Sequence, residues 1–298
     1  MALIGFGEVA AVFAAILASS AWPGNLSVGL ASRAPSAATS RRLGVAGLDP
    51  MPIEVAVRGA DLVVSLVPPA AAVTAAADVL EHLAPPGLLV DLTSTGPETA
   101  ALIAAAASRR GVDFVKGSLL GPVPILREAL PIVVAGAAAG RAEAWLRAVG
   151  FKEVLALEAP SDAAALKMVW SVVSKGLIAL LAESLTAAHR LGMLDHARSL
   201  VRSQLGFYGS DQMVARLLGS NAAAGSRRVD EMNDVARTLR ALDLPPFTVP
   251  STIAWLETLA ALLERPVSGA GEDPVAVLVN DISKRLHVGA GEPRIKEI

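Results

Sequence analysis

The chain of 298 residues has a net charge of −2, with 53% hydrophobic residues, only 4% aromatic residues and no cysteine. A near-neutral charge and so few aromatic side chains argue against a nucleic-acid-binding protein, which needs a basic surface and stacking side chains. The absence of cysteine excludes disulfides and zinc–thiolate sites, and it is typical of a cytoplasmic protein.

Short apolar runs alternate with helical patterns through the first half of the chain. The runs predicted as buried strands are residues 1–4, 26–31, 62–67, 87–92, 112–115, 130–135 and 153–157. The helices predicted between them are residues 8–20, 70–83, 97–109 and 140–149. This alternation predicts an α/β domain over residues 1–158, in which helices cover both faces of a parallel sheet.

Strand patterns end near residue 158, and the rest of the chain reads as helices. One long helix is expected over residues 162–191, with Ser161 as its N-cap and Gly192 as its end. Further helices are expected over residues 195–205, 210–218, 226–242 and 249–263. Residues 159–298 are therefore predicted to form an all-α domain, joined to the first domain by the long helix.

Unbroken apolar runs are too short to predict a membrane segment. The longest, residues 10–18 and 177–182, fall below the roughly 18 consecutive apolar residues that a membrane-spanning helix needs. We therefore expect no membrane association.

The stretch Gly5-Phe6-Gly7-Glu8-Val9-Ala10 joins the first predicted strand to the first predicted helix. In a phosphate-binding turn, the first glycine permits a tight bend and the second lets the backbone approach a pyrophosphate. The helix N-terminus adds free N–H groups and a partial positive charge. With a strand before it and a second strand about 20 residues on, the motif predicts a dinucleotide-binding Rossmann domain. A structural turn in another α/β fold is the alternative.

The end of the second predicted strand indicates which dinucleotide is bound. NAD-dependent enzymes usually place an acidic residue there, to accept hydrogen bonds from the ribose hydroxyls. No acidic residue occurs between residues 8 and 49; Ser32 and Arg33 follow the strand, and Arg41 and Arg42 come soon after. Because a guanidinium pairs well with a 2′-phosphate, the sequence predicts NADP rather than NAD.

The long helix has a narrow polar stripe that includes Lys167, Ser171 and Ser174, which share one helical face, while its other faces are apolar. Such a helix is expected to be buried, with its polar stripe facing a cleft, a partner or water. In a cleft, Lys167 can donate a proton to a carbonyl oxygen as hydride reaches the carbon, and Ser171 can hold that oxygen. The alternative is that Lys167 only extends to solvent. Lys175 is interpreted either as a ligand for a substrate carboxylate or phosphate or as a surface charge.

Two further segments are candidates because ligands of open α/β sheets bind beyond the carboxyl ends of the strands. Ser94 and Thr95 follow the predicted strand 87–92, where they could instead cap the helix expected from residue 97. Gly121, Pro122 and Val123 belong to a rigid loop that either lines the substrate or is structural.

Taken in order, these motifs resemble the β-hydroxyacid dehydrogenase superfamily, in its 6-phosphogluconate dehydrogenase-like group. The matching stretches are the turn at residues 5–10, Val67-Pro68-Pro69, Asp91-Leu92-Thr93-Ser94-Thr95-Gly96-Pro97 and Lys167. The resemblance implies that the turn, Val67 and Pro68 bind the cofactor. It also implies that Thr93 and Ser94 lie near the nicotinamide and that Lys167 is the catalytic lysine.

The second half departs from the pattern of that family. Ser171 stands where the family has asparagine, and residues 117–124 match its substrate-binding segment only loosely. Lys175-Gly176 and Arg227-Arg228-Val229-Asp230-Glu231-Met232 resemble a branch whose C-terminal domain has no known function.

These features together predict an NADPH-dependent oxidoreductase that transfers hydride between nicotinamide and a small polar carbonyl compound or hydroxy acid. One alternative is an imine reductase on the same fold, in which Tyr208, the only tyrosine, could supply the proton; packing in the core or at an interface is the other interpretation of Tyr208. Another is a non-catalytic NADP-binding protein. The four histidines are dispersed, so no metal site is expected. The apolar C-terminal half predicts a homodimer formed through the helical domain.

Overall fold

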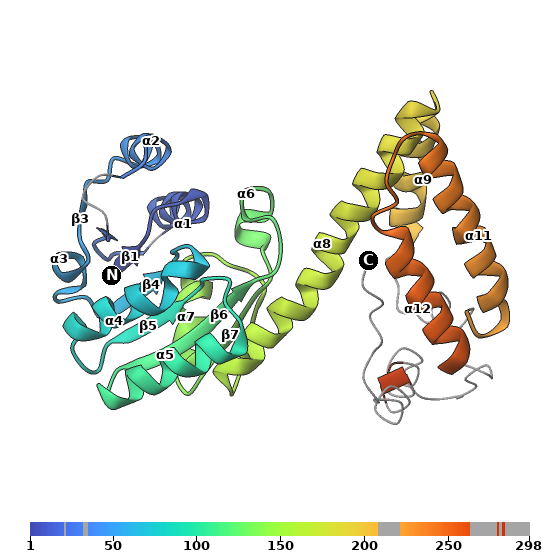
Figure 1. The fold of residues 1–298 in the computed structure, drawn as a ribbon. Helices are drawn as coiled ribbons and strands as arrows, with labels where there is room; N and C mark the ends of the chain where they lie inside the picture. Colours follow the sequence, from blue (N-terminus) through green and yellow to red (C-terminus); the bar gives the residue numbers. More distant parts are fainter. Residues whose placement is uncertain (21, 32–34, 208–220, 263–278, 280–281, 284–298) are drawn as a thin grey trace. The chain divides into compact units, whose positions relative to one another are not determined.

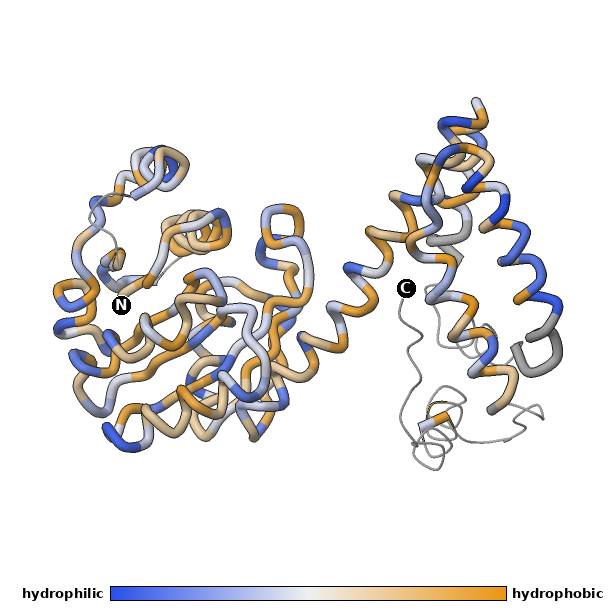
Figure 2. The backbone as a smooth tube through the Cα atoms, in the orientation of Figure 1, coloured by the Kyte–Doolittle hydropathy of each residue, from blue (hydrophilic) through white to orange (hydrophobic). Residues whose placement is uncertain are grey.

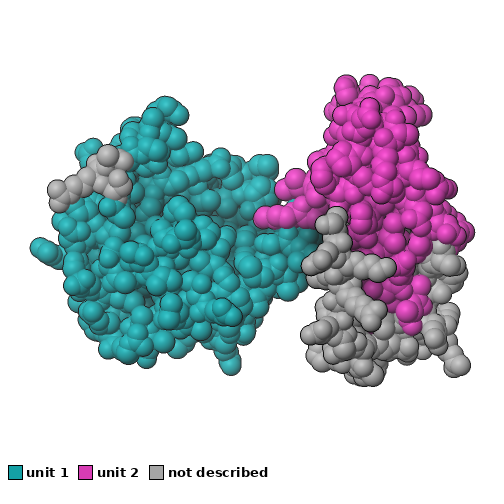
Figure 3. Space-filling view, in the orientation of Figure 1, with its two compact units in different colours: residues 1–174 teal, residues 175–298 magenta. Residues whose placement is uncertain are grey.

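The computed structural model describes residues 1–20, 22–31, 35–207, 221–262, 279 and 282–283. The chain divides into two compact units, Met1–Ser174 and Lys175–Ile298, which we name the N-terminal and C-terminal units (Figure 3). The last strand ends at Leu157, next to the domain boundary predicted at residue 158, whereas the two units divide within the long helix α8 (Pro160–Arg190).

The N-terminal unit is built on one eight-stranded sheet (Figure 1). Its strands lie in the order β3-β2-β1-β4-β5-β6-β7-β8. In chain order they are β1 (Ala2–Ile4), β2 (Ser27–Leu30), β3 (Pro50–Pro52), β4 (Leu62–Ser65), β5 (Leu88–Asp91), β6 (Asp113–Leu119), β7 (Ile132–Ala135) and β8 (Val154–Leu157). The helices are α1 (Glu8–Ser19), α2 (Ala37–Ala46), α3 (Ile53–Val57), α4 (Ala72–His82), α5 (Pro97–Arg109), α6 (Val123–Leu126) and α7 (Ala139–Ala148), with 3₁₀ turns η1 (Pro69–Ala71) and η2 (Arg127–Ala129). The Rossmann-like α/β architecture predicted for this half is confirmed.

Strand β3 and helices α2 and α3 were not expected from the sequence pattern. β3 has only three residues, two of them proline, and proline is tolerated in a sheet only where its missing N–H is not needed. Its position at the edge of the sheet meets that condition.

The prediction of a parallel sheet is wrong for its last two strands. β6 and β7 pair antiparallel, with Lys116 opposite Ala135, and β8 then pairs parallel to β7. Residues 120–131 contain only the short α6 and η2, whereas a parallel crossover usually needs a longer connection that includes a full helix. The chain therefore reverses direction at this point of the sheet.

Helices cover both faces of the sheet because neighbouring strand residues point to opposite sides. Leu3 packs in a cluster with Phe13 of α1, whereas Ile4 packs in a cluster with Val79 of α4 and Ile103 of α5. Fully burying a side chain of this size contributes roughly 1.5–3 kcal/mol. The two cores fix the strands in place, and so they fix the positions from which the loops at the carboxyl edge begin.

The C-terminal unit is helical among the described residues. It contains the second half of α8, α9 (Leu194–Phe207), α11 (Asn221–Ala241) and α12 (Val249–Leu262), which confirms three of the predicted helices. The predicted helix 210–218 and Tyr208 lie outside the described residues. Glu183 of α8 accepts hydrogen bonds from the N–H and hydroxyl groups of Thr248, at 2.7 and 3.1 Å, just before α12 begins.

Of the two predicted ends of the long helix, the C-terminal end at Gly192 is confirmed and the N-cap at Ser161 is wrong. Gly192 follows the helix with φ +69°, and its N–H donates to the carbonyl of His189, as in a helix stop. Ser161 is not the N-cap, because α8 already begins at Pro160. Proline suits the first helical position, where its missing N–H has no partner to lose.

The prediction that α8 is buried on its apolar faces is wrong for the single chain. Lys167, Ser171 and Ser174 are half-buried, whereas Val172 and Ile178 are 75% and 66% exposed. Figure 2 shows α8 as mostly apolar along its length, with a few polar positions. An 18-residue window of α8 has a mean hydropathy of 1.6, so among the described helices it is long and apolar enough to cross a membrane. Counting unbroken apolar runs missed this, because isolated charges interrupt the runs without lowering the mean below that of a membrane helix.

Candidate active site

The carboxyl ends of β1, β4, β5 and β6 meet at one edge of the sheet, because these strands run parallel to one another. The strand order reverses direction between β1 and β4, and such a switch point is where open α/β sheets bind ligands. The loops at this edge contain the glycine turn, Val67 and Pro68, Thr93 to Thr95, and Gly121 to Val123. The fold thus brings these predicted site residues to a common edge.

The glycine turn has the backbone that the motif requires. Gly5 adopts φ +85°, and its N–H donates to the carbonyl of Gly29 at 3.0 Å. A Cβ atom at Gly5 would meet the carbonyl oxygen of Leu66 at 3.0 Å and Cγ1 of Val67 at 3.1 Å. Glycine is therefore needed here for both conformation and space.

Gly7 differs from Gly5, because it is exposed and has nothing within 4 Å of an added Cβ atom. It is the N-cap of α1, and no side chain caps the helix. The N–H groups of the first helical turn are consequently available to an anion. Phe6 and Ala10 are buried beneath this turn, Val9 is half-buried and Glu8 is exposed.

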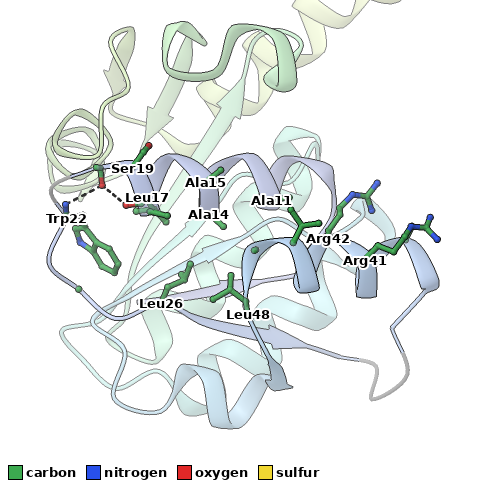
Figure 4. Close-up of a pocket in the computed structure, with 16 residues that line it drawn as sticks. Ala11, Ala14, Ala15, Leu17, Ser19, Trp22, Leu26, Arg41, Arg42 and Leu48 are labelled. Carbon is green, nitrogen blue, oxygen red and sulfur yellow. Dashed lines mark hydrogen bonds between the residues drawn. The ribbon is translucent and has the colours of Figure 1, made fainter.

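Ser32 and Arg33, predicted to select NADP, lie outside the described residues. Arg41 and Arg42 stand on α2, and within the described part of the chain neither guanidinium has an ion pair or hydrogen bond. They line one end of a groove of about 880 Å³ between α1 and α2. Figure 4 shows them projecting near the end marked by Ala11, with Trp22 at the opposite end. The groove has no acidic lining residue, so its arginine end is positively charged.

The loop after β5 does not cap the next helix, which answers the alternative raised for Ser94 and Thr95. Gly96 is the N-cap of α5, and no side chain hydrogen-bonds to its first turn. Ser94 is exposed, whereas Thr93 and Thr95 are buried, and both threonine hydroxyls lack a hydrogen-bond partner. Unpartnered buried hydroxyls are uncommon, so this loop offers polar groups that a ligand at the sheet edge can satisfy.

Lys167 is half-buried and contacts the end of β6 within the N-terminal unit. Its ammonium Nζ donates a hydrogen bond to the carbonyl of Leu119, the last residue of that strand. Nearby, the hydroxyl of Ser118 donates to the carbonyl of Ala163 at 2.7 Å, which ties α8 to the same strand. The amine is thus held at the carboxyl edge and is not directed only into bulk solvent.

The other predicted site residues lie on α8 and in the β6–β7 loop. The hydroxyl of Ser171 donates to the carbonyl of Lys167 at 2.8 Å, so its oxygen remains able to accept a hydrogen bond. Lys175 is exposed, two turns further along the helix. In the loop, Gly121 is half-buried, Pro122 exposed and Val123 buried, beside Leu119. The loop follows directly from the end of β6, the strand whose last carbonyl accepts from Lys167.

One residue near the site was missed by sequence reasoning. Lys116 is fully buried in β6 and forms an ion pair with Asp91, its register partner in β5, at 3.0 Å. Burial lowers the pKa of the Lys116 ammonium, against the opposing effect of the Asp91 carboxylate. The expected strand ended at residue 115, one position short of this lysine; an apolar run continuing on both sides of a charge was the available signal.

Within the described part of the chain, no group of three histidine or carboxylate residues is placed to hold a metal ion. Arg227 and Glu231 form an exposed ion pair on α11, at 2.6 Å. The site is therefore defined by backbone donors, hydroxyls and lysines.

Residues 188–259 match a family described as a domain of unknown function, DUF1932. Among solved structures, a conserved hypothetical protein from Sinorhizobium meliloti is 30% identical, with 95% of each chain covered and a TM-score of 0.54. The conserved protein MTH1747, described as similar in structure to 3-hydroxyacid dehydrogenases, is 27% identical over 87% of this chain and 96% of that chain, with a TM-score of 0.51. An imine reductase from Myxococcus stipitatus, in complex with NADP⁺, is 16% identical over 94% of this chain and 99% of that chain; its TM-score of 0.73 shows a shared fold. No curated protein matches the chain.

Proposed function

We propose that this chain, whose residues 188–259 match the DUF1932 domain and which is similar over most of its length to the Sinorhizobium protein and to MTH1747, is an NADPH-dependent oxidoreductase. It reduces a small polar carbonyl compound, or oxidises the corresponding hydroxy acid. The observation that carries this proposal is the hydrogen bond from Lys167 to the carbonyl of Leu119, at the edge where the candidate cofactor loops meet.

The residues at the sheet edge fit a nicotinamide dinucleotide. The free N–H groups of α1 suit a pyrophosphate, and the open space at Gly7 permits its close approach. When bound, the cofactor supplies or accepts the hydride. Positive charge from Arg41 and Arg42, together with Arg33, favours the 2′-phosphate and hence NADP over NAD.

Lys167 acts as the general acid in reduction and as the base in the reverse direction. Its Nζ is held at the end of β6 by the hydrogen bond to Leu119, the position from which it transfers a proton to a substrate oxygen. The Ser171 hydroxyl donates to the carbonyl of Lys167, so its oxygen accepts a hydrogen bond from the hydroxyl group of the hydroxy acid. Such proton transfer contributes about 10²- to 10⁴-fold to the rate.

An imine is the second candidate substrate. The Myxococcus imine reductase shares the fold over nearly the whole chain, and Ser171 replaces the asparagine expected for hydroxy acids. Lys167 could protonate an imine nitrogen as readily as a carbonyl oxygen, so the two substrates are separated by experiment.

A second copy of the chain is proposed to cover the exposed apolar faces of α8. Val169, Val172 and Ile178 are each at least 65% exposed, which is unfavourable in water. Lipid is a poorer cover, because the first turns of the helix are tied to β6 through Ser118 and Lys167. The protein is accordingly proposed to be a cytoplasmic homodimer.

The test is titration of the protein with NADPH and NADH by fluorescence, followed by consumption assays with 2- and 3-oxo acids and with cyclic imines. We expect the protein to bind NADPH more tightly than NADH and to consume NADPH when an oxo acid is present. NADPH consumption with imines but not with oxo acids would identify an imine as the substrate. NADPH binding without consumption would favour a non-catalytic protein.

A further inference from the structure

Lys116 uses all three of its ammonium hydrogens on the segment that follows β5. Its Nζ donates to Oδ2 of Asp91 at 3.0 Å, to the carbonyl of Asp91 at 3.0 Å, and to the carbonyl of Thr93. The other carboxylate oxygen, Oδ1 of Asp91, accepts from the N–H of Thr93 at 3.0 Å. The ion pair therefore holds both the N–H and the carbonyl of Thr93.

Close packing restrains the same segment from the next residue of β6. A Cβ atom at Gly117 would lie 2.2 Å from Cδ2 of Leu92, so the leucine side chain occupies the space that a larger residue would need. Beyond it, the N–H of Thr95 donates to the carbonyl of Thr93 at 2.9 Å. Residues 91–95 are thus fixed to β6 by a charge pair, by packing and by their own turn.

Stability alone does not account for this pair. A buried salt bridge loses much of its Coulombic gain to desolvation, and an apolar pair of similar volume is often as stable. Burial lowers the pKa of Lys116 in spite of the neighbouring Asp91 carboxylate, which is consistent with that desolvation cost. What an apolar pair cannot do is hold the backbone of Thr93 in one place.

We propose, on the basis of the oxidoreductase function proposed above, that Lys116 is a positioning residue for the reaction. It fixes residues 91–95 so that the hydroxyls of Thr93 and Thr95 bind the nicotinamide end of the cofactor or the substrate. Both hydroxyls are buried without a partner at the carboxyl edge, as expected for groups whose partner is a ligand.

Kinetics of two variants test this role. Lys116→Met removes the three hydrogen bonds. Lys116→Met combined with Asp91→Asn also neutralises the carboxylate, and it serves where the single variant folds poorly. We expect kcat to fall roughly ten- to a hundredfold, as for a slightly misplaced reacting group, while the dissociation constant for NADPH changes less than about threefold because the α1 turn is untouched. Leu146→Ala, on the buried face of α7, is the control for lost stability and should retain kcat when folded.

Coupling to Thr95 distinguishes positioning from general damage. Thr95→Val alone should lower kcat, and adding it to Lys116→Met should lower kcat little further, because Lys116→Met already displaces the Thr95 hydroxyl. Losses that multiply would overturn the proposal, as would an unchanged kcat in both Lys116 variants.

Hydrogen exchange supplies a readout that needs no turnover, which separates failure of this inference from failure of the proposed function. Amides of residues 92–96 should exchange faster in the Lys116 variants than in wild type, and no faster in Leu146→Ala. Unchanged exchange would overturn the positioning role even in an active enzyme. Faster local exchange in a protein without oxidoreductase activity would support the restraint on the loop and refute its catalytic purpose.

Discussion

Lys116 lies in β6 and Lys167 contacts Leu119, the last residue of that strand, and the two lysines differ in burial. Lys116 is fully buried, with every ammonium hydrogen used on residues 91–93. Lys167 is half-buried and donates to the carbonyl of Leu119 at the end of the strand. Only Lys167 can therefore exchange a proton with a ligand at the sheet edge, whereas Lys116 acts through the backbone that it holds.

Replacing Lys167 tests the proton-transfer role. Lys167→Ala should lower kcat at least about 100-fold, because a positioned acid contributes that much or more, while NADPH affinity should change little. The measurements are steady-state consumption of NADPH and fluorescence titration. Lys152→Ala removes an equal charge from an exposed loop and should remain active. Near-normal turnover of Lys167→Ala would remove lysine catalysis from the mechanism.

The lowered pKa of Lys116 predicts a pH dependence of stability. Because burial lowers this pKa below 10.5, the unfolded chain binds the proton more tightly than the native protein. Stability then rises with pH between the native pKa and that of the unfolded chain. The free energy of unfolding of wild type minus that of Lys116→Met should be larger at about pH 9.5 than at about pH 7.5, measured by urea denaturation. A difference that stays constant or falls with pH would show that the native pKa is not lowered.

At the scale of the element, the two glycines of the turn are expected to differ in role, with Gly5 needed for stability and Gly7 for NADPH binding. Gly5→Ala introduces a side chain at φ +85° and against Leu66, so it should cost about 1–3 kcal/mol of stability. Gly7→Ala has open space and ordinary φ, so it should lose only about 0.5–1 kcal/mol of stability, because alanine is a poorer N-cap than glycine. NADPH affinity should nevertheless fall at least about tenfold in Gly7→Ala, because the methyl group obstructs the pyrophosphate. Urea denaturation and fluorescence titration check both; normal NADPH binding by Gly7→Ala would place the pyrophosphate elsewhere.

Periodicity predicted the elements that carry a strong pattern and missed those defined by pairing. The central strands are short but mainly apolar runs, and α1, α4 and α5 are longer apolar or amphipathic segments, so all of them were predicted. The direction of β7 depends on the length of one loop, and β3 exists only because it pairs at an edge. Within the site, Lys167 was predicted from helical spacing, but Lys116 was not, because a pattern of apolar residues does not show that a charge finds a partner on the next strand.

At the scale of the whole molecule, the faces of α8 mark the limit of sequence reasoning. An apolar face predicts burial, but not which chain provides the cover. Half-buried Lys167, Ser171 and Ser174 occupy the stripe predicted to be polar, whereas apolar side chains such as Val172 and Ile178 are exposed. An exposed surface of this kind is typical of a protein interaction site, which is why the helix points to a second copy of the chain.

Charged substitutions on the exposed apolar surface of α8 test the proposed dimer. Val172→Glu combined with Ile178→Glu should convert a dimer into a monomer, because two carboxylates would be buried without partners at the interface. Stability of the isolated chain should change little, since the two side chains are 75% and 66% exposed. Val45→Glu, on α2 and 91% exposed, makes the same kind of change away from α8 and should leave the dimer intact. Light scattering with size-exclusion chromatography gives the mass of each variant. A monomeric wild type, or a dimer that survives both glutamates, would mean that α8 is not the contact, and recovery of the wild type in the membrane fraction would identify lipid as its cover.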